Sequence, residues 1–235
     1  MLKKIFISIR EGKGSWWKIS EKNEKKAGKQ LEENFVKELK RIEFTRLDKE
    51  ELINKEKKQW EKLKKEVQKK EKNELITNNF SPSVTNGFVY SPYGSQNYPD
   101  FLFFTSKYII PVELKSSKVA RPVWNSHLPR KNGLYIFVAC GEKSDITFFR
   151  GVDVIDKDLS NKLIGFFEKA RKTEEDFIES LKEKDKSERG WKPYIRIAYD
   201  QAKSLLTSHG KLNYFEHPRR EEIENKVLEW LEDKD

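Results

Sequence analysis

Cysteine and histidine are scarce in this sequence. Cys140 is its only cysteine, and His127, His209 and His217 are its only histidines. A single cysteine excludes both an intrachain disulfide and a zinc site built from several cysteines. So few sulfur and imidazole groups also argue against soft-metal chemistry.

Long apolar runs are missing as well. No uncharged apolar run approaches the roughly 20 residues that a bilayer-spanning helix needs, so we expect no membrane partner. The opening residues "MLKKIFISIREGKGSWWK" are basic. Their apolar run is only about five residues, against the roughly 7 to 15 of a secretory signal. These absences predict a cytoplasmic protein.

Charge, by contrast, is abundant. Of the 235 residues, 37% are charged, and 48 lysines and arginines against 39 acidic residues give a formal net charge of +9. A basic excess favours a polyanionic partner, because lysines and arginines that neutralise phosphates release counterions. The composition therefore favours a nucleic acid as the partner.

Two stretches in the first third have the spacing of amphipathic helices. Residues 49–74 hold ten lysines and seven glutamates around a narrow apolar stripe, which predicts a very polar helix. That helix is either a solvated one laced with charge pairs, or an arm that grips DNA or contacts a dimer partner. Residues 21–45 predict an earlier helix whose apolar positions are three and four residues apart: Leu31, Phe35, Val36, Leu39 and Ile42.

The middle of the chain reads as a sheet. A strand-like "KIFISI" lies near the start, and after a loop rich in Asn, Ser, Pro and Gly come "FVYSPYG", "FLFF", "YIIPVEL", "LYIFVA" and "ITFFRGVDVI". Helical spacing returns over residues 159–184. A strand "PYIRIAY", a helix starting near Asp200 and a last helix starting at Pro218 complete the pattern.

This order of elements predicts an α/β or α+β fold, with a central mixed β-sheet flanked by helices. We expect one domain over residues 1–235. Its helical N-terminal part covers about 20–76, its sheet core about 84–156, and its C-terminal helices and strand 159–235.

Three charged residues interrupt the apolar hairpin "NYPDFLFFTSKYIIPVELKSSK". Glu113 and Lys115 lie two residues apart and therefore share one face of a strand. If "FLFF" and "YIIPVEL" form an antiparallel hairpin that closes over residues 105–108, Asp100 lies opposite Glu113 on that same face. On the other face Tyr108, Ile110, Val112 and Leu114 alternate as core.

Two carboxylates this close repel each other unless a shared proton or a cation neutralises them. Oxygen ligands without sulfur or imidazole suit magnesium, which commonly binds through one or two carboxylates and a substrate phosphate. A lysine beside them can orient an attacking water and stabilise charge that develops on phosphorus. The group fits metal-assisted phosphodiester hydrolysis; the alternative is that Asp100 caps a turn while Glu113 and Lys115 form a surface ion pair.

Pro99-Asp100 followed by Glu113-Leu114-Lys115 resembles the motif of the PD-(D/E)xK nucleases. The following "SSKVARPVWNSHLPRKNGLYIFVA" resembles most a type II restriction endonuclease of that superfamily. The resemblance implies a restriction-endonuclease-like core and an enzyme that uses Mg²⁺ to cut both strands of DNA at a short site, leaving 5′-phosphates. It further implies that Asp100 and Glu113 are metal ligands and that Lys115 acts at the attacking water.

Members of this superfamily often carry a further acidic residue on a helix before the hairpin, and Glu32 and Glu33 are the candidates. At roughly 100° per residue, Glu32 lies inside the apolar stripe of the predicted helix and Glu33 points away from it. We therefore expect Glu32 to join the catalytic group. Its alternative is a structural ion pair, because a buried carboxylate needs a partner.

The segment "SSKVARPVWNSHLPRKNG" leaves the active-site end of the strand and is well placed to follow a duplex. Arginine can bond guanine and asparagine can bond adenine, whereas lysine more often contacts phosphate. Trp124 either packs in the core or stacks on a base. The predicted DNA-contacting residues are Lys118, Arg121, Trp124, Asn125, Ser126, His127, Arg130 and Lys131.

The leading functional hypothesis is a sequence-specific endonuclease of a restriction-modification system, acting on double-stranded DNA. A DNA repair or junction-resolving nuclease and a non-enzymatic DNA-binding protein are the alternatives. Cutting both strands of a palindrome favours a twofold homodimer, although a monomer that nicks each strand in turn is also possible. The lysine-rich helix and the C-terminal helix with Trp230 are the candidate dimer surfaces.

Overall fold

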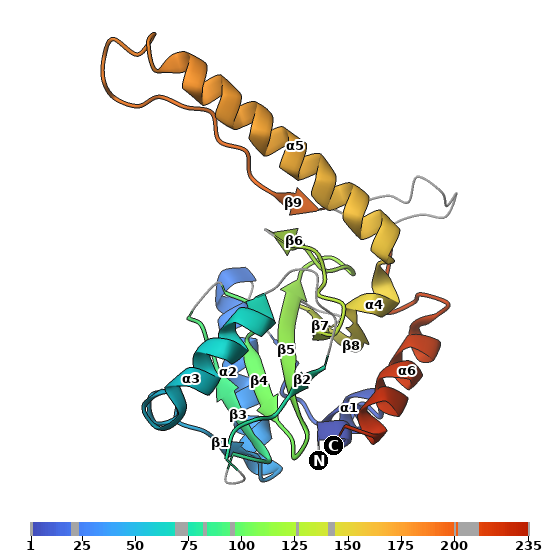
Figure 1. Cartoon of the computed structure of the whole chain (residues 1–235). Helices are drawn as coiled ribbons and strands as arrows, with labels where there is room; N and C mark the ends of the chain where they lie inside the picture. Colours follow the sequence, from blue (N-terminus) through green and yellow to red (C-terminus); the bar gives the residue numbers. More distant parts are fainter. Residues whose placement is uncertain are drawn as a thin grey trace.

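The computed structural model describes residues 2–19, 24–68, 75–81, 84–94, 97–125, 127–140, 144–199, 201 and 212–234. Within these residues seven strands form one mixed sheet in the order β1-β3-β4-β5-β7-β8, with β2 paired to β5 (Figure 1). The strands are β1 (Thr45–Arg46), β2 (Ile76–Thr77), β3 (Gly87–Tyr90), β4 (Phe101–Phe104), β5 (Tyr108–Ser117), β7 (Leu134–Ala139) and β8 (Asp145–Arg150).

Strands β3, β4 and β5 form an antiparallel meander, β7 runs parallel to β5, and β8 runs antiparallel to β7. All four residues of β4 are buried, as are five of the six in β7. Both faces of a sheet are covered when its strands read as continuous apolar runs. The predicted mixed sheet flanked by helices is therefore confirmed at the level of architecture.

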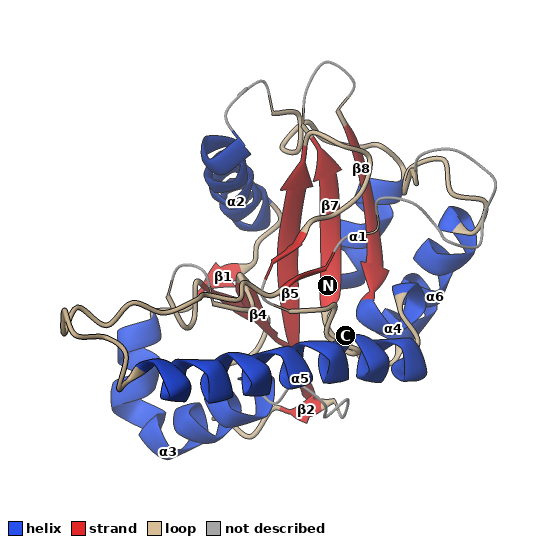
Figure 2. Cartoon of the chain, turned by 90° about the horizontal axis from the view of Figure 1, so that it is seen from above, coloured by secondary structure: helices blue, strands red, loops and turns tan. Residues whose placement is uncertain are grey.

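One face of the sheet is covered by α1 (Leu2–Arg10), α2 (Glu24–Arg41) and α6 (Arg220–Glu232), whose apolar residues join one core cluster. The opposite face is covered by α3 (Lys49–Gln68) and α4 (Gly151–Val154), which belong to a second cluster. Figure 2 shows α2 and α3 on opposite sides of the strands. The predicted stripe of α2 is confirmed, since Leu31, Phe35 and Leu39 are each at most 1% exposed.

The first element is a helix, so the predicted strand "KIFISI" is wrong. Leu2, Ile5, Phe6 and Ile9 are all buried, and their spacing is that of a helix face. The adjacent pair Ile5 and Phe6 cannot both point inward from a half-exposed strand. Helix α1 packs on α6 and β8, which brings the two ends of the chain together (Figure 1).

The two helices proposed as dimer surfaces use their apolar stripes on the chain's own core. In α3 the residues Trp60, Leu63 and Val67 are buried, and in α6 Val227 and Leu231 are buried. Neither stripe is therefore open to a second copy. The helix expected near Asp200 lies outside the described residues.

A long helix, α5 (Lys157–Leu181), leaves the core as a projecting arm (Figure 1). Asp156 caps it, accepting a hydrogen bond from Leu159 N at 2.8 Å. The chain then returns along the helix to a two-residue strand, β9 (Ala198–Tyr199), which pairs with β6 (Trp124–Asn125). Only this short piece of the strand predicted from "PYIRIAY" is formed.

Within the described residues, no helix combines the length and the apolar character that crossing a membrane requires.

Candidate active site

The site is built where two neighbouring strands separate. The predicted hairpin register is confirmed, with Phe104 opposite Ile109 and Phe101 opposite Val112. Strand β4 begins at Phe101, whereas β5 continues to Ser117 beside β7. The last β4–β5 pair is Phe101 with Val112. Asp100 precedes Phe101 and Glu113 follows Val112, so both lie where the two strands separate.

The carboxylates of Asp100 and Glu113 each accept a hydrogen bond from the backbone beside the other residue. The Asp100 N–H donates to Glu113 Oε2 at 3.2 Å, and the Leu114 N–H donates to Asp100 Oδ2 at 2.8 Å. Lys115 Nζ donates to Glu113 Oε1 at 2.8 Å. The two carboxylates and the ammonium therefore converge at the predicted end of the hairpin.

Burial disfavours the charged form of the Asp100 carboxyl. The pKa of Asp100 is raised well above its ordinary value, first because the carboxyl is buried and then because the carboxylates of Glu113 and Glu32 lie near it. The Leu114 N–H and the Lys115 ammonium act in the opposite direction without cancelling the rise. The site is therefore short of positive charge.

Glu32 reaches the same site from α2, as its position on the helix predicted. Its Oε2 accepts a hydrogen bond of 2.6 Å from the Tyr90 hydroxyl. Burial raises the pKa of Glu32, and the carboxylate of Glu113 raises it further, although the Tyr90 bond opposes this. Glu33 instead has a side chain that is 55% exposed and lies 3.9 Å from Lys29.

Two aromatic residues hold this group. Sequence reasoning did not select Tyr90, and it assigned Trp124 to the core or to DNA and not to this group. Tyr90 ends β3, and the β3–β4 register sets it opposite Phe101, one residue after Asp100. Trp124 lies on the other side, with Lys115 Nζ 5.6 Å from its ring centre. The alternation of side chains along β3 could have indicated Tyr90. The two-residue strand β6 is too short to show such a pattern for Trp124.

Asp100 and Glu113 are the residues that fit a magnesium ion. They offer hard oxygen donors, and Lys115 is the cation that acts on Asp100 against the carboxylates of Glu113 and Glu32. Magnesium often binds through only one or two carboxylates, with water and substrate phosphate completing its shell. Among the residues that the structure describes, no group of three or more Asp, Glu, His or Cys side chains is placed so that it could hold a metal ion together.

The loop after β5 divides the predicted DNA contacts into exposed and buried side chains. Lys118, Asn125 and Lys131 are exposed, and Arg121 is half-buried. Trp124 is only 1% exposed, and its ring packs against Tyr135 at 5.3 Å. Of the two alternatives for Trp124, the structure supports packing in the core, because the ring is already enclosed there.

Two further candidates already have protein partners. The Arg130 guanidinium lies over the Tyr98 ring and donates to the carbonyl of Gln68 at 3.1 Å. His127 is half-buried beside Tyr98, and its pKa is lowered by burial and then by the nearby Lys115 ammonium. Both side chains anchor the loop beside the site. Ser126 lies outside the described residues.

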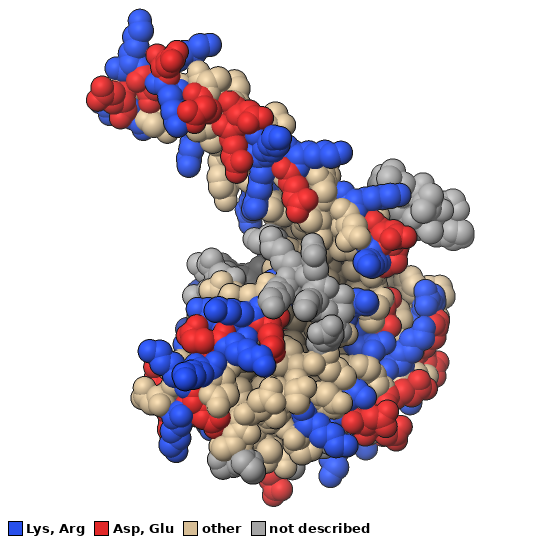
Figure 3. All heavy atoms as spheres, viewed as in Figure 1, with Lys and Arg blue, Asp and Glu red and all other residues tan. Residues whose placement is uncertain are grey.

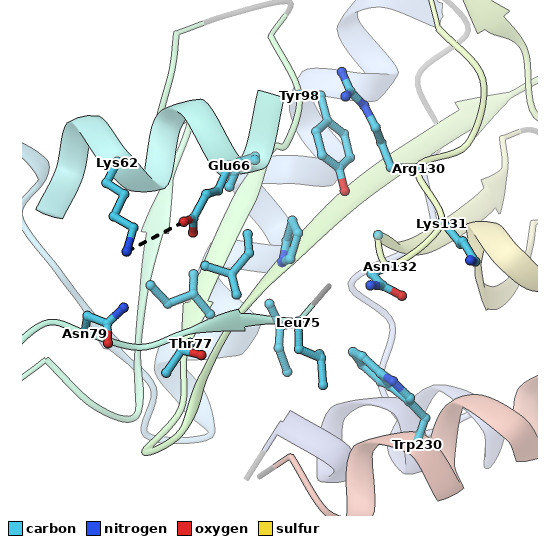
Figure 4. A pocket seen from close by; sticks show the side chains of 16 residues that line it. Lys62, Glu66, Leu75, Thr77, Asn79, Tyr98, Arg130, Lys131, Asn132 and Trp230 are labelled. Carbon is cyan, nitrogen blue, oxygen red and sulfur yellow. Dashed lines mark ion pairs between the residues drawn. The ribbon is translucent and has the colours of Figure 1, made fainter. Parts of the chain in front are cut away.

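A pocket of about 250 Å³ lies beside this group rather than at it (Figure 4). Lys62 and Glu66 of α3 line one side and Trp230 of α6 another, while Tyr98 and Arg130 form the wall toward the loop. None of the four clustered charged residues lines it. The candidate active site is thus at the splitting strands, not in this hollow.

A scan against protein-family models, a search of curated proteins and a search of solved structures each find no match to this chain.

The raised pKa of Asp100 predicts that its charge destabilises the fold at neutral pH. The folded state binds the proton more tightly than the unfolded chain, so stability falls as the pH rises through the folded pKa. Asp100→Asn removes the charge and keeps an oxygen that can accept from Leu114 N. We expect urea unfolding at pH 8 to show a gain of about 1 kcal/mol or more, and the gain to shrink as the pH falls toward 4.

Asp156→Asn is the matched control, because asparagine caps a helix as well as aspartate does. It should change stability little at either pH. A loss of stability in Asp100→Asn at pH 8, or a gain that does not vary with pH, would contradict the electrostatic description of the site.

Proposed function

We propose that this protein is a magnesium-dependent DNA endonuclease, and within that class a sequence-specific type II restriction endonuclease of the PD-(D/E)xK kind. The observation that carries the proposal is the convergence of Glu32, Glu113 and Lys115 on Asp100, at the end of the hairpin where β4 and β5 separate. Elements from three parts of the sequence bring these charges together, and burial of such charges without a partner is costly. A surface ion pair does not account for the third carboxylate.

In the proposed reaction a water attacks the scissile phosphorus and the bond to the 3′ oxygen breaks, which leaves a 5′-phosphate and a 3′-hydroxyl. A magnesium ion held by Asp100 and Glu113 supplies Lewis-acid stabilisation of the phosphate charge. Lys115 orients the water and adds positive charge beside the phosphate. Its own position is fixed by Glu113 and by the face of Trp124.

Glu32 completes the group from the opposite side. Its carboxylate adds negative charge that favours a cation at Asp100 and Glu113, and the Tyr90 hydroxyl fixes its direction. In this proposal it is a positioning residue for the metal and its waters. Glu32 has this role, and Glu33 does not, because only Glu32 lies on the face of α2 that points toward the site.

The molecular surface around the site supports a duplex as the substrate. Lys118, Asn125 and Lys131 are exposed on the loop that leaves β5. Figure 3 shows basic and acidic side chains together over α3, where seven lysines exceed five glutamates and Lys57, Lys58, Lys64 and Lys65 are exposed. Lysines so placed contribute sequence-independent binding to the phosphate backbone. In the proposal, Arg121 and Asn125 are the candidates for contacts to bases.

Removing the ammonium should abolish most of the chemistry and leave DNA binding intact. Lys115→Ala is expected to slow Mg²⁺-dependent cleavage of a duplex by about 10²-fold or more, measured in single-turnover reactions. Binding of the same duplex in Ca²⁺ should survive. Lys107→Ala, an exposed lysine in the β4–β5 turn, is the control, and equal rates for both variants would reject the assignment.

Glu32 and Glu33 form a second matched pair, adjacent in sequence and opposite in environment. Glu32→Gln keeps the side-chain size and an acceptor for Tyr90, and it should slow cleavage by roughly tenfold or more and raise the Mg²⁺ concentration needed for half-maximal rate. Glu33→Gln should leave both quantities unchanged. A slower Glu33→Gln enzyme beside a normal Glu32→Gln enzyme would overturn the placement.

A further inference from the structure

Helix α5 is unusual because none of its 25 residues is buried. A helix of that length spans roughly 37 Å, and Figure 1 shows it extending away from the sheet. Helices in proteins draw most of their stability from packing an apolar face, not from intrinsic propensity. A projecting helix with apolar residues on two faces therefore needs something that packs against each face.

The returning chain already covers one side of the helix. The Phe167 ring contacts the Tyr199 ring at 5.0 Å between centroids, and Ile195 N donates to Glu174 Oε1 at 2.8 Å. Ile164 and Ile178 are half-buried on this same side. The arm is thus a helix with a strap along one face.

A neighbouring face of the helix, roughly 100° away around its axis, carries an uncovered apolar stripe. Leu159, Phe166 and Phe177 are 48%, 65% and 53% exposed. At roughly 100° per residue these three point within about 20° of one direction. Leu163 and Ala170 lie between them, so the stripe follows the alternating spacing of four and three residues that is typical of a coiled-coil seam.

Charged residues along one flank of this stripe change sign halfway. Lys162 and Lys169 lie on the N-terminal half, and Asp176 and Glu183 lie on the C-terminal half and in the turn that follows it. All four are exposed. Two copies of such a helix are complementary only when they run in opposite directions, because each basic half then meets an acidic half.

We propose that the uncovered stripe of α5 pairs with the same stripe of a second copy of this chain, antiparallel and about a twofold axis. The register that matches the charges places Lys169 of one copy beside Asp176 of the other, and Lys162 beside Glu183. The same register stacks Phe166 on Phe177 of the second copy and Ala170 on Thr173. This register matches the flanking charges and the central layers of the seam, whereas Leu163 and Leu159 lie beside the polar Ser180 and Lys184 at its ends. Twofold symmetry repeats each contact.

Other occupants of this stripe fit less well. In a parallel pair Lys162 would meet Phe167 of the second copy and Lys169 would meet Glu174, and the strap already contacts both of these side chains. A DNA backbone would be repelled by Asp176 and Glu183 and gains nothing from exposed phenylalanines. Both signs of charge are interspersed along the arm (Figure 3), which favours a protein surface over a phosphate backbone.

The test is the oligomeric state of the full chain, measured by sedimentation equilibrium without DNA or metal, so it does not depend on the proposed nuclease activity. The wild type should be a dimer at micromolar concentration. Phe166→Glu should weaken the dimer by about 100-fold or more in Kd, because it places a charge in the apolar seam. Trp191→Glu, which alters an exposed aromatic residue off the stripe, should leave it unchanged.

A charge exchange tests the direction of the pair. Lys169→Glu and Asp176→Lys should each weaken the dimer by roughly tenfold, and the double variant should recover to near the wild-type Kd. Parallel pairing predicts no recovery. A wild type that is monomeric at high concentration, or a dimer indifferent to Phe166→Glu, would overturn the proposal.

Cysteine cross-linking tests the register directly, since the native Cys140 is buried. Ala170→Cys mixed with Thr173→Cys should form a disulfide between the two variants on mild oxidation, and each variant alone should form far less. Self-linking of Ala170→Cys as the main product would indicate a parallel pair and contradict the antiparallel register.

Discussion

The contact between Asp100 and Glu113 is the constraint on which the rest of the site depends. Each carboxylate accepts a hydrogen bond from a backbone N–H of the other's segment, and Glu113 is buried while Asp100 is half-buried. Two carboxylates in such surroundings favour a proton or a cation. The fold could have placed apolar residues at this end of the hairpin, and it places four charges there instead.

The elements around this contact hold it in one arrangement. Helix α2 brings Glu32 from one side and β3 brings Tyr90, while β6 brings the face of Trp124 against Lys115. Trp124 is itself fixed by Tyr135 and by a hydrogen bond of 3.1 Å to Gln201. The buried tryptophan therefore links Lys115 to the loop that the proposal assigns to DNA and, through β9, to the arm.

The sequence was sufficient for the hairpin and for the face of α2. Apolar runs with a single polar gap determine the hairpin register, and a one-residue shift would have moved Glu113 into the core. It was not sufficient for α1, where a six-residue run fits a strand and a helix equally well. Trp124 was also ambiguous, because only the tertiary packing of β6 decides between a buried and a stacking ring.

The partner and the substrate depend on which side chains are exposed. The hydrophobic pattern of a single sequence predicts buried residues better than it predicts exposed binding surfaces. The lysine-rich α3 and the C-terminal α6 resembled free amphipathic surfaces, yet both pack on the sheet. The helical spacing of α5 was visible, but its projection from the core and the strap along one face follow from the return of the chain to β6. The exposed stripe was therefore visible only in three dimensions.

Incubation of the purified wild-type protein with a duplex library, with and without Mg²⁺, followed by sequencing of the fragment ends, tests the catalytic assignment most directly. The proposed role of Asp100, with Glu32, Glu113 and Lys115 around it, predicts cleavage only with Mg²⁺, with 5′-phosphate ends that share one short sequence. Cleavage confined to added branched or mismatched DNA would keep the chemistry and reject the restriction activity. Binding of DNA without Mg²⁺-dependent cleavage of any substrate would contradict the catalytic role of the cluster.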